Sequence, residues 1–522
     1  MKLQNYICGQ WVEGMGQGTA LHDPVTGDIL AFAGSEGIDL KAALVYARRE
    51  GNPALQALNY TKRARLLGAI ANLLMAHREK YCKIALENSG NTSVDAQIDV
   101  DGGIGTLKYY AAAGESLGEG NFLTEPGMDR LARDKAFQST HILTPLKGVA
   151  IHINAFNFPS WGLWEKAAVA LLSGIPVFAK PATATSLLTY EMVKDVIAAE
   201  ILPKGSLSLI CGGGHSLMDY VETGDAVLFT GSADTARHLR TNQQVVKSGV
   251  RFNVEADSVN MALLGGDVDV ESPLFNAFVR TVVKEMTNKA GQKCTAIRRI
   301  LVPKKIIKSV TDALAINLAK TTVGDPREEG VRMGPLVSKA QQRAAWEGIA
   351  ILRQEAELVY GGDKEFSPIG GNSVQGCFVQ PTLLRCMSPM NAIRVHDTEV
   401  FGPVATLMPY ESQAEALALA ARGGGSLVGS VFSNDDEFIS RSMIELASSH
   451  GRVLVVDEAV YSGHTGHGIV MPQCVHGGPG RAGGGEELGG LRGIRLYHQR
   501  TAIQGNVDRL NALRQLTIDI LN

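Results

Sequence analysis

The sequence predicts an α/β protein with parallel β-sheets, crossover helices and more than one domain. Strand signals alternate with helix signals along most of the chain, and this order favours parallel pairing because parallel strands need a crossover between them. The chain has 522 residues, whereas single hydrophobic cores stop growing well below that size. Its 58 glycines have no regular period, which indicates many tight turns.

The first half of the chain gives these elements in order. Residues 41–118 show the apolar periodicity of helices, with glycine stops. The segments that follow alternate between strand and helix signals: extended chain at 138–153, a helix at 161–174, a buried strand at 175–181, a helix at 187–203, and strand-then-turn signals at 207–214 and 226–232. This rhythm predicts a first parallel sheet.

The second half repeats the pattern and then changes character. A second alternating region covers roughly 260–475, which predicts a second sheet. Residues 477–490 are so rich in glycine that we expect irregular chain there. The last twenty residues predict a helical tail.

Composition excludes several classes of partner. Lys and Arg total 50 and Asp and Glu total 53, so charge gives no reason to expect nucleic acid or a membrane surface. The seven cysteines contain no CxxC pair, which predicts no metal site and favours a reducing, cytoplasmic setting. No window approaches the roughly 20 apolar residues of a membrane span, and the start lacks the apolar core of a signal peptide.

Three predicted strand ends carry candidate binding residues, since parallel α/β sheets bind ligands at the carboxyl ends of their strands. "FAKPATAT" ends a strand with Lys180, and "LFTGSADTARHL" ends one at Phe229 and opens a helix at Ser232 that could receive a pyrophosphate. "ICGGGHSL" puts Gly212 in a glycine turn. No full GxGxxG follows a strand, and each such turn, taken alone, is more often only a turn.

Cys294 lies in "NKAGQKCTAIRRI", between a helix-like and a strand-like segment. A lone cysteine is most often a core residue, but three other segments alter that expectation. "FNVEADSVN" puts Glu255 at a strand end, where a carboxylate is rarely buried without a purpose. "NAFNFPSWGLW" puts Asn157 before a proline-broken turn, and "HDTEVFGPV" puts Glu399 and Phe401 before a rigid Gly-Pro turn.

Together these segments resemble the ordered motifs of the aldehyde dehydrogenase superfamily. "NAFNFP", "AKPA", "FTGS", "VEAD", "GQKC" and "EVFGPV" occur in the order and rough spacing of that family, and the likeness runs from about residue 5 to about residue 500. "VEADSVN", in place of the commoner "ELGG", is closer to the branch that acts in aerobic phenylacetate and benzoyl-CoA breakdown. Because we expect no fused hydratase, the chain is more similar to the free-standing enzymes of that branch.

The resemblance implies a fold and an assembly. The expected architecture is the aldehyde dehydrogenase fold, with a Rossmann-like cofactor domain, an α/β catalytic domain and a small β oligomerisation arm. The implied divisions are the cofactor domain at 1–127 and 148–257, the arm at 128–147, the catalytic domain at 258–478, and the arm with a C-terminal tail at 479–522. A homodimer is expected.

The residues allow a covalent oxidation of an aldehyde. A thiolate at Cys294 would attack the carbonyl, and the Asn157 amide with the backbone N–H of Cys294 would meet the oxyanion. After hydride transfer to a nicotinamide, Glu255 would activate the water that hydrolyses the thioester, and it could also take the thiol proton. We expect burial in a partly apolar site to raise the pKa of Glu255.

The resemblance also implies the cofactor contacts. Lys180 would bind the adenosine ribose, Ser232 the pyrophosphate and Glu399 the nicotinamide ribose, while Phe401 would wall the ring. The other expected cofactor residues are Ile153, Asn154, Phe156, Ala182, Thr183, Gly212, Phe229, Thr230 and Gly231. Family members strict for NAD usually carry a glutamate three residues after the lysine, where this sequence has threonine. NADP is therefore expected, with NAD as the weaker alternative.

Some residues and alternatives stay open. His464, His476 and Arg481 could face the substrate mouth, although loop histidines are more often merely exposed, and Glu487 only weakly matches a family glutamate. The branch implies a CoA-linked semialdehyde such as 3,4-dehydroadipyl-CoA semialdehyde, with a general aliphatic aldehyde or another semialdehyde as the alternative.

Rival classes fit the sequence less well. An acylating enzyme that passes the acyl group to CoA has no need of Glu255, since only hydrolysis requires a base. A thiol hydrolase without nicotinamide leaves Lys180 and "EVFGPV" unexplained. Cys294, Glu255 and Asn157 together argue against a non-catalytic protein.

Overall fold

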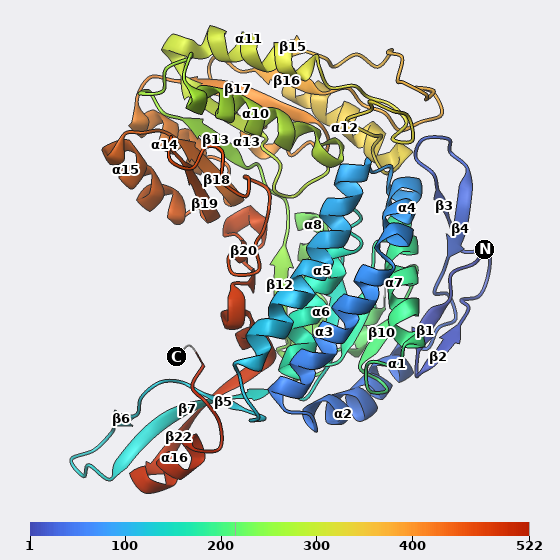
Figure 1. The fold of residues 1–522 in the computed structure, drawn as a ribbon, viewed down its shortest axis with the longest axis vertical. Helices are drawn as coiled ribbons and strands as arrows, with labels where there is room; N and C mark the ends of the chain where they lie inside the picture. Colours follow the sequence, from blue (N-terminus) through green and yellow to red (C-terminus); the bar gives the residue numbers. More distant parts are fainter. Residues whose placement is uncertain (215, 521–522) are drawn as a thin grey trace.

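The structure is a computed structural model that describes residues 1–214 and 216–520. Two seven-stranded sheets form its centre, and a small antiparallel sheet projects from them as an arm (Figure 1). Helices connect the parallel strands, which confirms the predicted α/β class. Within the described residues, no helix is both long enough and apolar enough to cross a membrane.

The first sheet is built mainly from parallel strands. Its strands, in spatial order, are β12 (Arg251–Glu255), β11 (Ala226–Thr230), β8 (Ala150–Ile153), β9 (Val177–Lys180), β10 (Leu207–Leu209), β1 (Asn5–Ile7) and β2 (Gln10–Val12). β12 to β10 pair in parallel, and β1 and β2 add an antiparallel edge. The inner strands are apolar runs because helices cover both of their faces.

The second sheet has the same parallel character. Its strands, in spatial order, are β15 (Glu357–Tyr360), β16 (Thr382–Arg385), β17 (Val404–Tyr410), β14 (Arg299–Pro303), β13 (Met261–Leu264), β18 (Ser426–Phe432) and β19 (His450–Val456). Only β15 runs antiparallel to its neighbour. A short hairpin near the N-terminus pairs β3 (Thr19–His22) with β4 (Ile29–Ala33).

Sixteen α-helices lie in the described residues and connect or flank these sheets. They are α1 (Leu40–Tyr46), α2 (Asn52–Gln56), α3 (Tyr60–Ala76), α4 (Arg78–Ser89), α5 (Ser93–Glu115), α6 (Trp161–Ser173), α7 (Ser186–Ala198), α8 (Ala233–Arg240), α9 (Gln243–Ser248), α10 (Pro273–Thr287), α11 (Ile307–Leu318), α12 (Lys339–Leu352), α13 (Arg394–Asp397), α14 (Gln413–Ala421), α15 (Asp436–Ala447) and α16 (Val507–Arg514). The first five fall within the region predicted to be helical.

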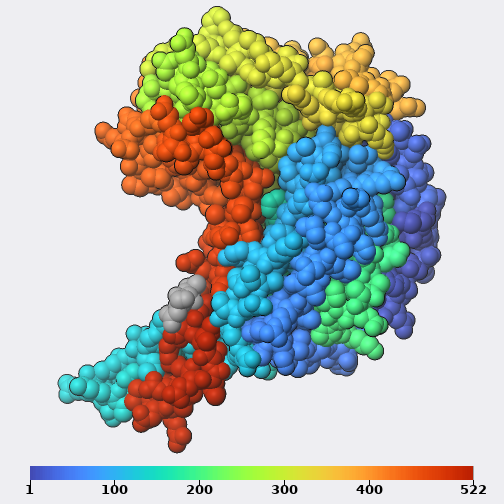
Figure 2. Space-filling model, in the orientation of Figure 1, coloured from blue at the N-terminus to red at the C-terminus, as the bar shows by residue number. Residues whose placement is uncertain are grey.

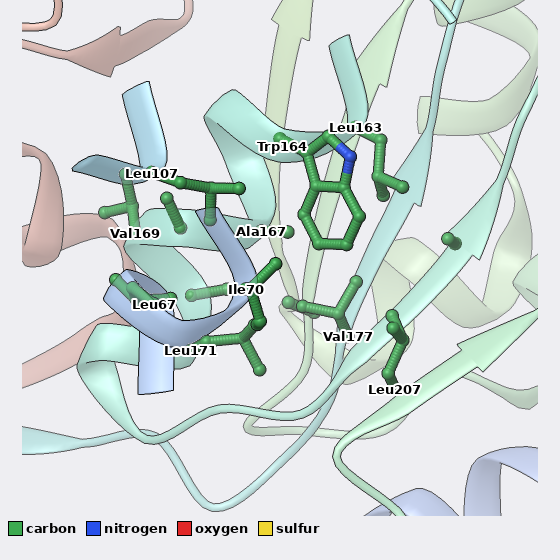
Figure 3. Packing of buried hydrophobic residues seen from close by; sticks show 14 of the residues in the cluster. Leu67, Ile70, Leu107, Leu163, Trp164, Ala167, Val169, Leu171, Val177 and Leu207 are labelled. Carbon is green, nitrogen blue, oxygen red and sulfur yellow. The ribbon is translucent and has the colours of Figure 1, made fainter. Parts of the chain in front are cut away.

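Helix α6 sits at the centre of the largest hydrophobic core. Trp164 and Ala167 on α6 pack among Leu67 of α3, Leu107 of α5 and Val177 of β9 (Figure 3). All five side chains are fully buried, and truncating a buried tryptophan costs about 3–5 kcal/mol. This packing holds α6 against β8 and β9 of the first sheet.

The arm is a four-stranded antiparallel sheet. Its strands are β22 (His498–Asn506), β7 (Phe137–Pro145), β5 (Leu123–Thr124) and β6 (Asp129–Arg130). β22 and β7 pair along their whole lengths. The space-filling view shows the arm extending at the lower left, with a hollow between it and the orange region above, which contains α14 and α15 (Figure 2).

Two predictions about the C-terminal region are wrong in part. The glycine-rich segment contains a hairpin of β20 (Val475–Gly477) and β21 (Glu486–Leu488), because three-residue strands between glycines leave too short a pattern to detect. The last twenty residues, predicted to be a helical tail, begin with the end of β22 and continue as the short helix α16, so that prediction is confirmed only over Val507–Arg514. The domain boundaries themselves stay a prediction.

Candidate active site

The loop before Cys294 has an unusual backbone. A 3₁₀ turn, Asn288–Gly291, follows α10, and Lys289, Ala290 and Gly291 all have positive φ, between 52° and 69°. A Cβ atom on Gly291 would lie 2.2 Å from the carbonyl oxygen of Gly402. Only glycine fits this close approach, so the nucleophile loop is pressed against the "EVFGPV" turn.

Polar side chains hold this loop in place. Arg298 donates to the carbonyl of Gly402 at 2.6 Å and to that of Gly291 at 2.8 Å, so one guanidinium ties the two loops together. Asn260 donates to the carbonyl of Cys294 at 2.7 Å. Because the backbone of Cys294 is fixed at both the loop and the carbonyl, the thiol has a defined position.

Three groups converge on the reacting centre. Glu255 ends β12, as predicted, and one ligand atom from each of Glu255, Cys294 and His476 lies within 4.8 Å of the other two. His476 Nε2 is 3.1 Å from Glu255 Oε1, and the Thr230 hydroxyl is 3.4 Å from Oε2. The structure thus brings together the predicted nucleophile and base, and adds a histidine that the sequence left open.

The electrostatics of the pair differ from our expectation. Burial raises the pKa of Glu255, but the charges of His476 and Lys166 and the hydrogen bonds from His476 and the thiol together bring that pKa below its usual range. The predicted raised pKa is therefore wrong. Burial and the Glu255 charge raise the pKa of the Cys294 thiol well above its ordinary value. The resting nucleophile is a thiol that needs a base.

A buried ionic cluster lies next to Glu255. Lys166 Nζ is 2.9 Å from Glu165 Oε1 and 2.9 Å from Glu487 Oε2. One carboxylate oxygen from each of Glu165, Glu255 and Glu487 lies within 4.8 Å of the other two. Sequence reasoning missed Glu165 and Lys166, although a charged pair inside the apolar helix "WGLWEKAAVALLSG" was an available signal. Glu487, which matched a family glutamate only weakly in sequence, belongs to this cluster.

Two cavities meet at Cys294. The larger cavity has a volume of about 550 Å³ and the smaller one about 40 Å³. Asn157, Glu255 and Cys294 line both. Apolar side chains of Phe158, Trp161 and Val470 wall the smaller cavity. The three predicted catalytic residues are therefore accessible from both the larger and the smaller cavity.

Most of the predicted cofactor residues line the larger cavity. They are Ile153, Asn154, Phe156, Lys180, Ala182, Phe229, Thr230, Gly231, Ser232, Glu399 and Phe401. Thr183 and Gly212 are not in this lining. Thr183 begins a 3₁₀ turn beside it. Gly212 packs against the backbone of Gly34 and Ser35, where a Cβ would lie 2.8–2.9 Å away, so close packing explains that glycine.

The larger cavity offers groups of the kind that a dinucleotide needs. Ser232 caps α8 by accepting from the backbone N–H of Thr235 at 3.2 Å, as the sequence predicted. Both side-chain amide atoms of Asn154 are buried without a hydrogen-bond partner in the described residues. The rings of Phe156 and Phe401 lie 5.6 Å apart at 82°. Aromatic walls and unpaired polar atoms fit a nicotinamide nucleotide.

Two charged side chains in this cavity have shifted pKa values. Burial lowers the pKa of Lys180, whose ammonium donates only to the Pro181 carbonyl, at 3.3 Å, among the described residues. Burial raises the pKa of Glu399 to about 7, although Arg298 lies 3.9 Å away and the Ser258 backbone N–H donates to it at 3.2 Å. Both groups are polar atoms removed from water that a ligand could satisfy.

The other residues left open have separate places. Arg481 lines the larger cavity and donates to the carbonyl of His396 at 3.2 Å. His464 lines neither cavity. His476 lines the smaller cavity and is buried.

Known proteins resemble this chain along nearly its whole length. The model of the aldehyde dehydrogenase family matches residues 11–499. The 3,4-dehydroadipyl-CoA semialdehyde dehydrogenase of Aromatoleum evansii is 56% identical over 92% of this chain and 93% of its own. The alpha-ketoglutaric semialdehyde dehydrogenase of Bacillus subtilis is 28% identical over 83% and 85% of the two chains.

Solved structures share the fold. A betaine aldehyde dehydrogenase double mutant from Staphylococcus aureus, in complex with NAD+, has a TM-score of 0.84 and 25% identity, and the match covers 97% of both chains. A neighbour from Burkholderia cenocepacia, titled a putative aldehyde dehydrogenase, also has a TM-score of 0.84. The chain therefore belongs to the aldehyde dehydrogenase family and is an NAD(P)-dependent aldehyde oxidoreductase.

Proposed function

We propose that this enzyme oxidises a CoA-linked semialdehyde, 3,4-dehydroadipyl-CoA semialdehyde, to its carboxylic acid with NADP+ in the breakdown of aromatic acids. The 56% identity with the Aromatoleum enzyme over 92% of the chain carries the choice of substrate. The reaction runs through a covalent intermediate on Cys294, a residue that faces both cavities.

The catalytic residues have complementary tasks. Glu255 takes the thiol proton, and the Cys294 thiolate adds to the aldehyde carbon. The Asn157 amide donates to the oxygen that becomes negative. The larger cavity, lined by Phe156 and Phe401, would hold a nicotinamide, which would supply the hydride acceptor. Glu255 releases the thiol proton to solvent, which its lowered pKa favours, and the carboxylate then activates water against the thioester.

The small size of the second cavity favours an aldehyde with a narrow chain. Phe158, Trp161 and Val470 give the smaller cavity an apolar wall beside Cys294, and a linear acyl chain fits such a wall. A bulky CoA group would stay outside it. A general aliphatic aldehyde satisfies the same wall, so it remains the alternative substrate.

Two observations support NADP over NAD. Thr183 stands where NAD-specific members usually carry glutamate, so no carboxylate at that position repels a 2′-phosphate. Within the described residues, the Lys180 ammonium donates to the Pro181 carbonyl and forms no ion pair. Partial burial lowers its pKa, so an added phosphate would stabilise the charged form.

We further propose a cytoplasmic homodimer. All seven cysteines are unpaired, which fits a reducing compartment. The arm projects from the molecule with mostly exposed residues on β22, and an exposed antiparallel edge is a ready pairing surface. Light scattering at several concentrations would report the state, and a monomer throughout would contradict it.

A steady-state comparison tests the substrate and cofactor together. CoA-linked semialdehyde and free aliphatic aldehydes of matched length are each assayed with NADP+ and NAD+. We expect the highest kcat/KM for the CoA-linked substrate with NADP+. Equal values for the free aldehydes would favour the general enzyme, whereas a requirement for free CoA would indicate acyl transfer to CoA.

A further inference from the structure

His476 is buried beside the catalytic residues, although a histidine in a glycine-rich segment is more often exposed. It lies on β20, is 5% exposed and lines the smaller cavity beside Cys294. Its Nε2 lies 3.1 Å from Glu255 Oε1. β20 is held there by its pairing with β21, in which His476 faces Glu487 in register. The fold therefore delivers an imidazole to the catalytic base.

Without His476, the carboxylates around Glu255 outnumber the cations that contact them. The elements packed against Glu255 present Glu165 and Lys166 from α6, Glu487 from β21, and the neutral Cys294 thiol. Carboxylates that share a buried site cannot all ionise unless cations offset them. Lys166 supplies one positive charge to these three carboxylates, and burial raises the pKa of Glu487 among them. A second cation is needed for Glu255 to remain ionised, and His476 is the group in contact.

The hydrogen bonds of Glu255 also indicate that His476 holds its carboxylate in place. Among the described residues, the Thr230 hydroxyl makes a long contact with Oε2, at 3.4 Å, whereas Oε1 has the shorter contact with His476, at 3.1 Å. A carboxylate aimed at a thiol needs a donor on its far side to stay in that orientation. The imidazole is the main donor that fixes Oε1.

We propose that His476 is a positioning residue that holds the Glu255 carboxylate ionised and turned toward Cys294 by donating from Nε2. The proton of the Cys294 thiol passes to Glu255, and His476 stays cationic throughout. Loss of the imidazole leaves Glu255 beside two other carboxylates with Lys166 as the remaining cation. Glu255 then holds its proton to higher pH. This role concerns the base of aldehyde oxidation and does not depend on which aldehyde or nicotinamide cofactor is natural.

The pH profile of kcat/KM tests the proposal, with a linear aliphatic aldehyde and saturating cofactor. For His476→Phe, we expect the midpoint of the acidic limb to move at least about one unit upward, because an opposite charge at this distance lowers a carboxyl pKa by roughly 1–3 units. His476→Gln keeps a donor near the Nε2 position and loses the charge, so its shift should be smaller and its maximal rate higher than in the phenylalanine variant. His464→Gln, a loop histidine that lines neither cavity, should overlay the wild type.

The outcomes separate positioning from packing. A packing defect lowers the rate at every pH without moving the limb, so a fall in amplitude with an unmoved midpoint in both His476 variants would overturn the proposal. Should His476→Phe fail to fold, His476→Gln carries the same readout, since its volume is close to that of histidine. A limb that moves with His464→Gln as far as with the His476 variants would also overturn it.

Discussion

The sulfur of Cys294 lies within 4.8 Å of a carboxylate oxygen of Glu255, and both residues line the same two cavities. The pKa of the thiol is raised and that of the carboxyl is lowered. The proton therefore rests on sulfur, and thiolate forms in quantity only when another interaction stabilises it. A dormant thiol resists oxidation between turnovers.

Replacing Cys294 tests the covalent mechanism. Cys294→Ala should lower turnover by more than about 1000-fold, because loss of a nucleophile removes the whole covalent route. The cofactor should still bind, since the larger cavity keeps its other lining. Turnover is followed as NADPH absorbance and binding by nucleotide fluorescence. Near-normal turnover in the alanine variant would exclude a covalent mechanism at Cys294.

Replacing Glu255 separates its two tasks. Glu255→Gln keeps the shape and loses the basicity. If deacylation is the main task, a pre-steady-state burst of NADPH should remain while steady turnover almost vanishes. If thiol deprotonation is the main task, the burst itself should slow. An unchanged steady rate would exclude both tasks.

The reactivity of the thiol should depend on pH in a defined direction. Because the pKa of Cys294 is raised by burial and by the Glu255 charge, alkylation by iodoacetamide in cofactor-free enzyme should still be accelerating at pH 9. Glu255→Gln removes the neighbouring negative charge, so its alkylation profile should move to lower pH. Mass spectrometry of the Cys294 peptide measures the labelling. Faster labelling of the wild type than of the variant at pH 7 would contradict this electrostatic account.

The cofactor preference should respond to one position. Thr183→Glu should erode the NADP preference through like-charge repulsion, chiefly by weakening NADP binding. One charge-assisted contact is worth roughly 1.5–3 kcal/mol, so we expect the NADP:NAD ratio of kcat/KM to fall about 10- to 150-fold. Thr183→Gln serves as the uncharged control. Because Thr183 lies beside the cavity lining, an unchanged ratio would mean that it only begins the following turn.

Glu399 links stability to pH. The folded-state pKa of about 7 exceeds the ordinary 4.5, so the stability associated with the protonated form is full below pH 4.5 and is lost as pH rises through about 7. Glu399→Gln removes that loss. It should leave stability unchanged near pH 4.5 and raise it by up to about 3 kcal/mol at pH 8. Urea unfolding at both pH values measures this, and a variant less stable than wild type at pH 8 would show that Arg298 outweighs burial.

The sequence predicts well the parts of the site that depend on short patterns. Lys180, Glu255 and Ser232 stand at the strand ends and helix start that local periodicity indicated. His476 could not be placed in this way, because its contact with Glu255 depends on a three-residue strand within glycines and on the pairing of distant segments. The prediction that the pKa of Glu255 is raised was wrong for the same reason. Burial was visible in the pattern, whereas the cations that oppose it were not.

The two cavities that meet at Cys294 give the proposed reactants separate space. With the aldehyde in the smaller cavity and the nucleotide in the larger one, both would reach the sulfur without competing for one cavity. An acyl chain attached to the sulfur would occupy the smaller cavity and leave the larger one open. The larger cavity would then be the side from which the hydrolytic water reaches the thioester.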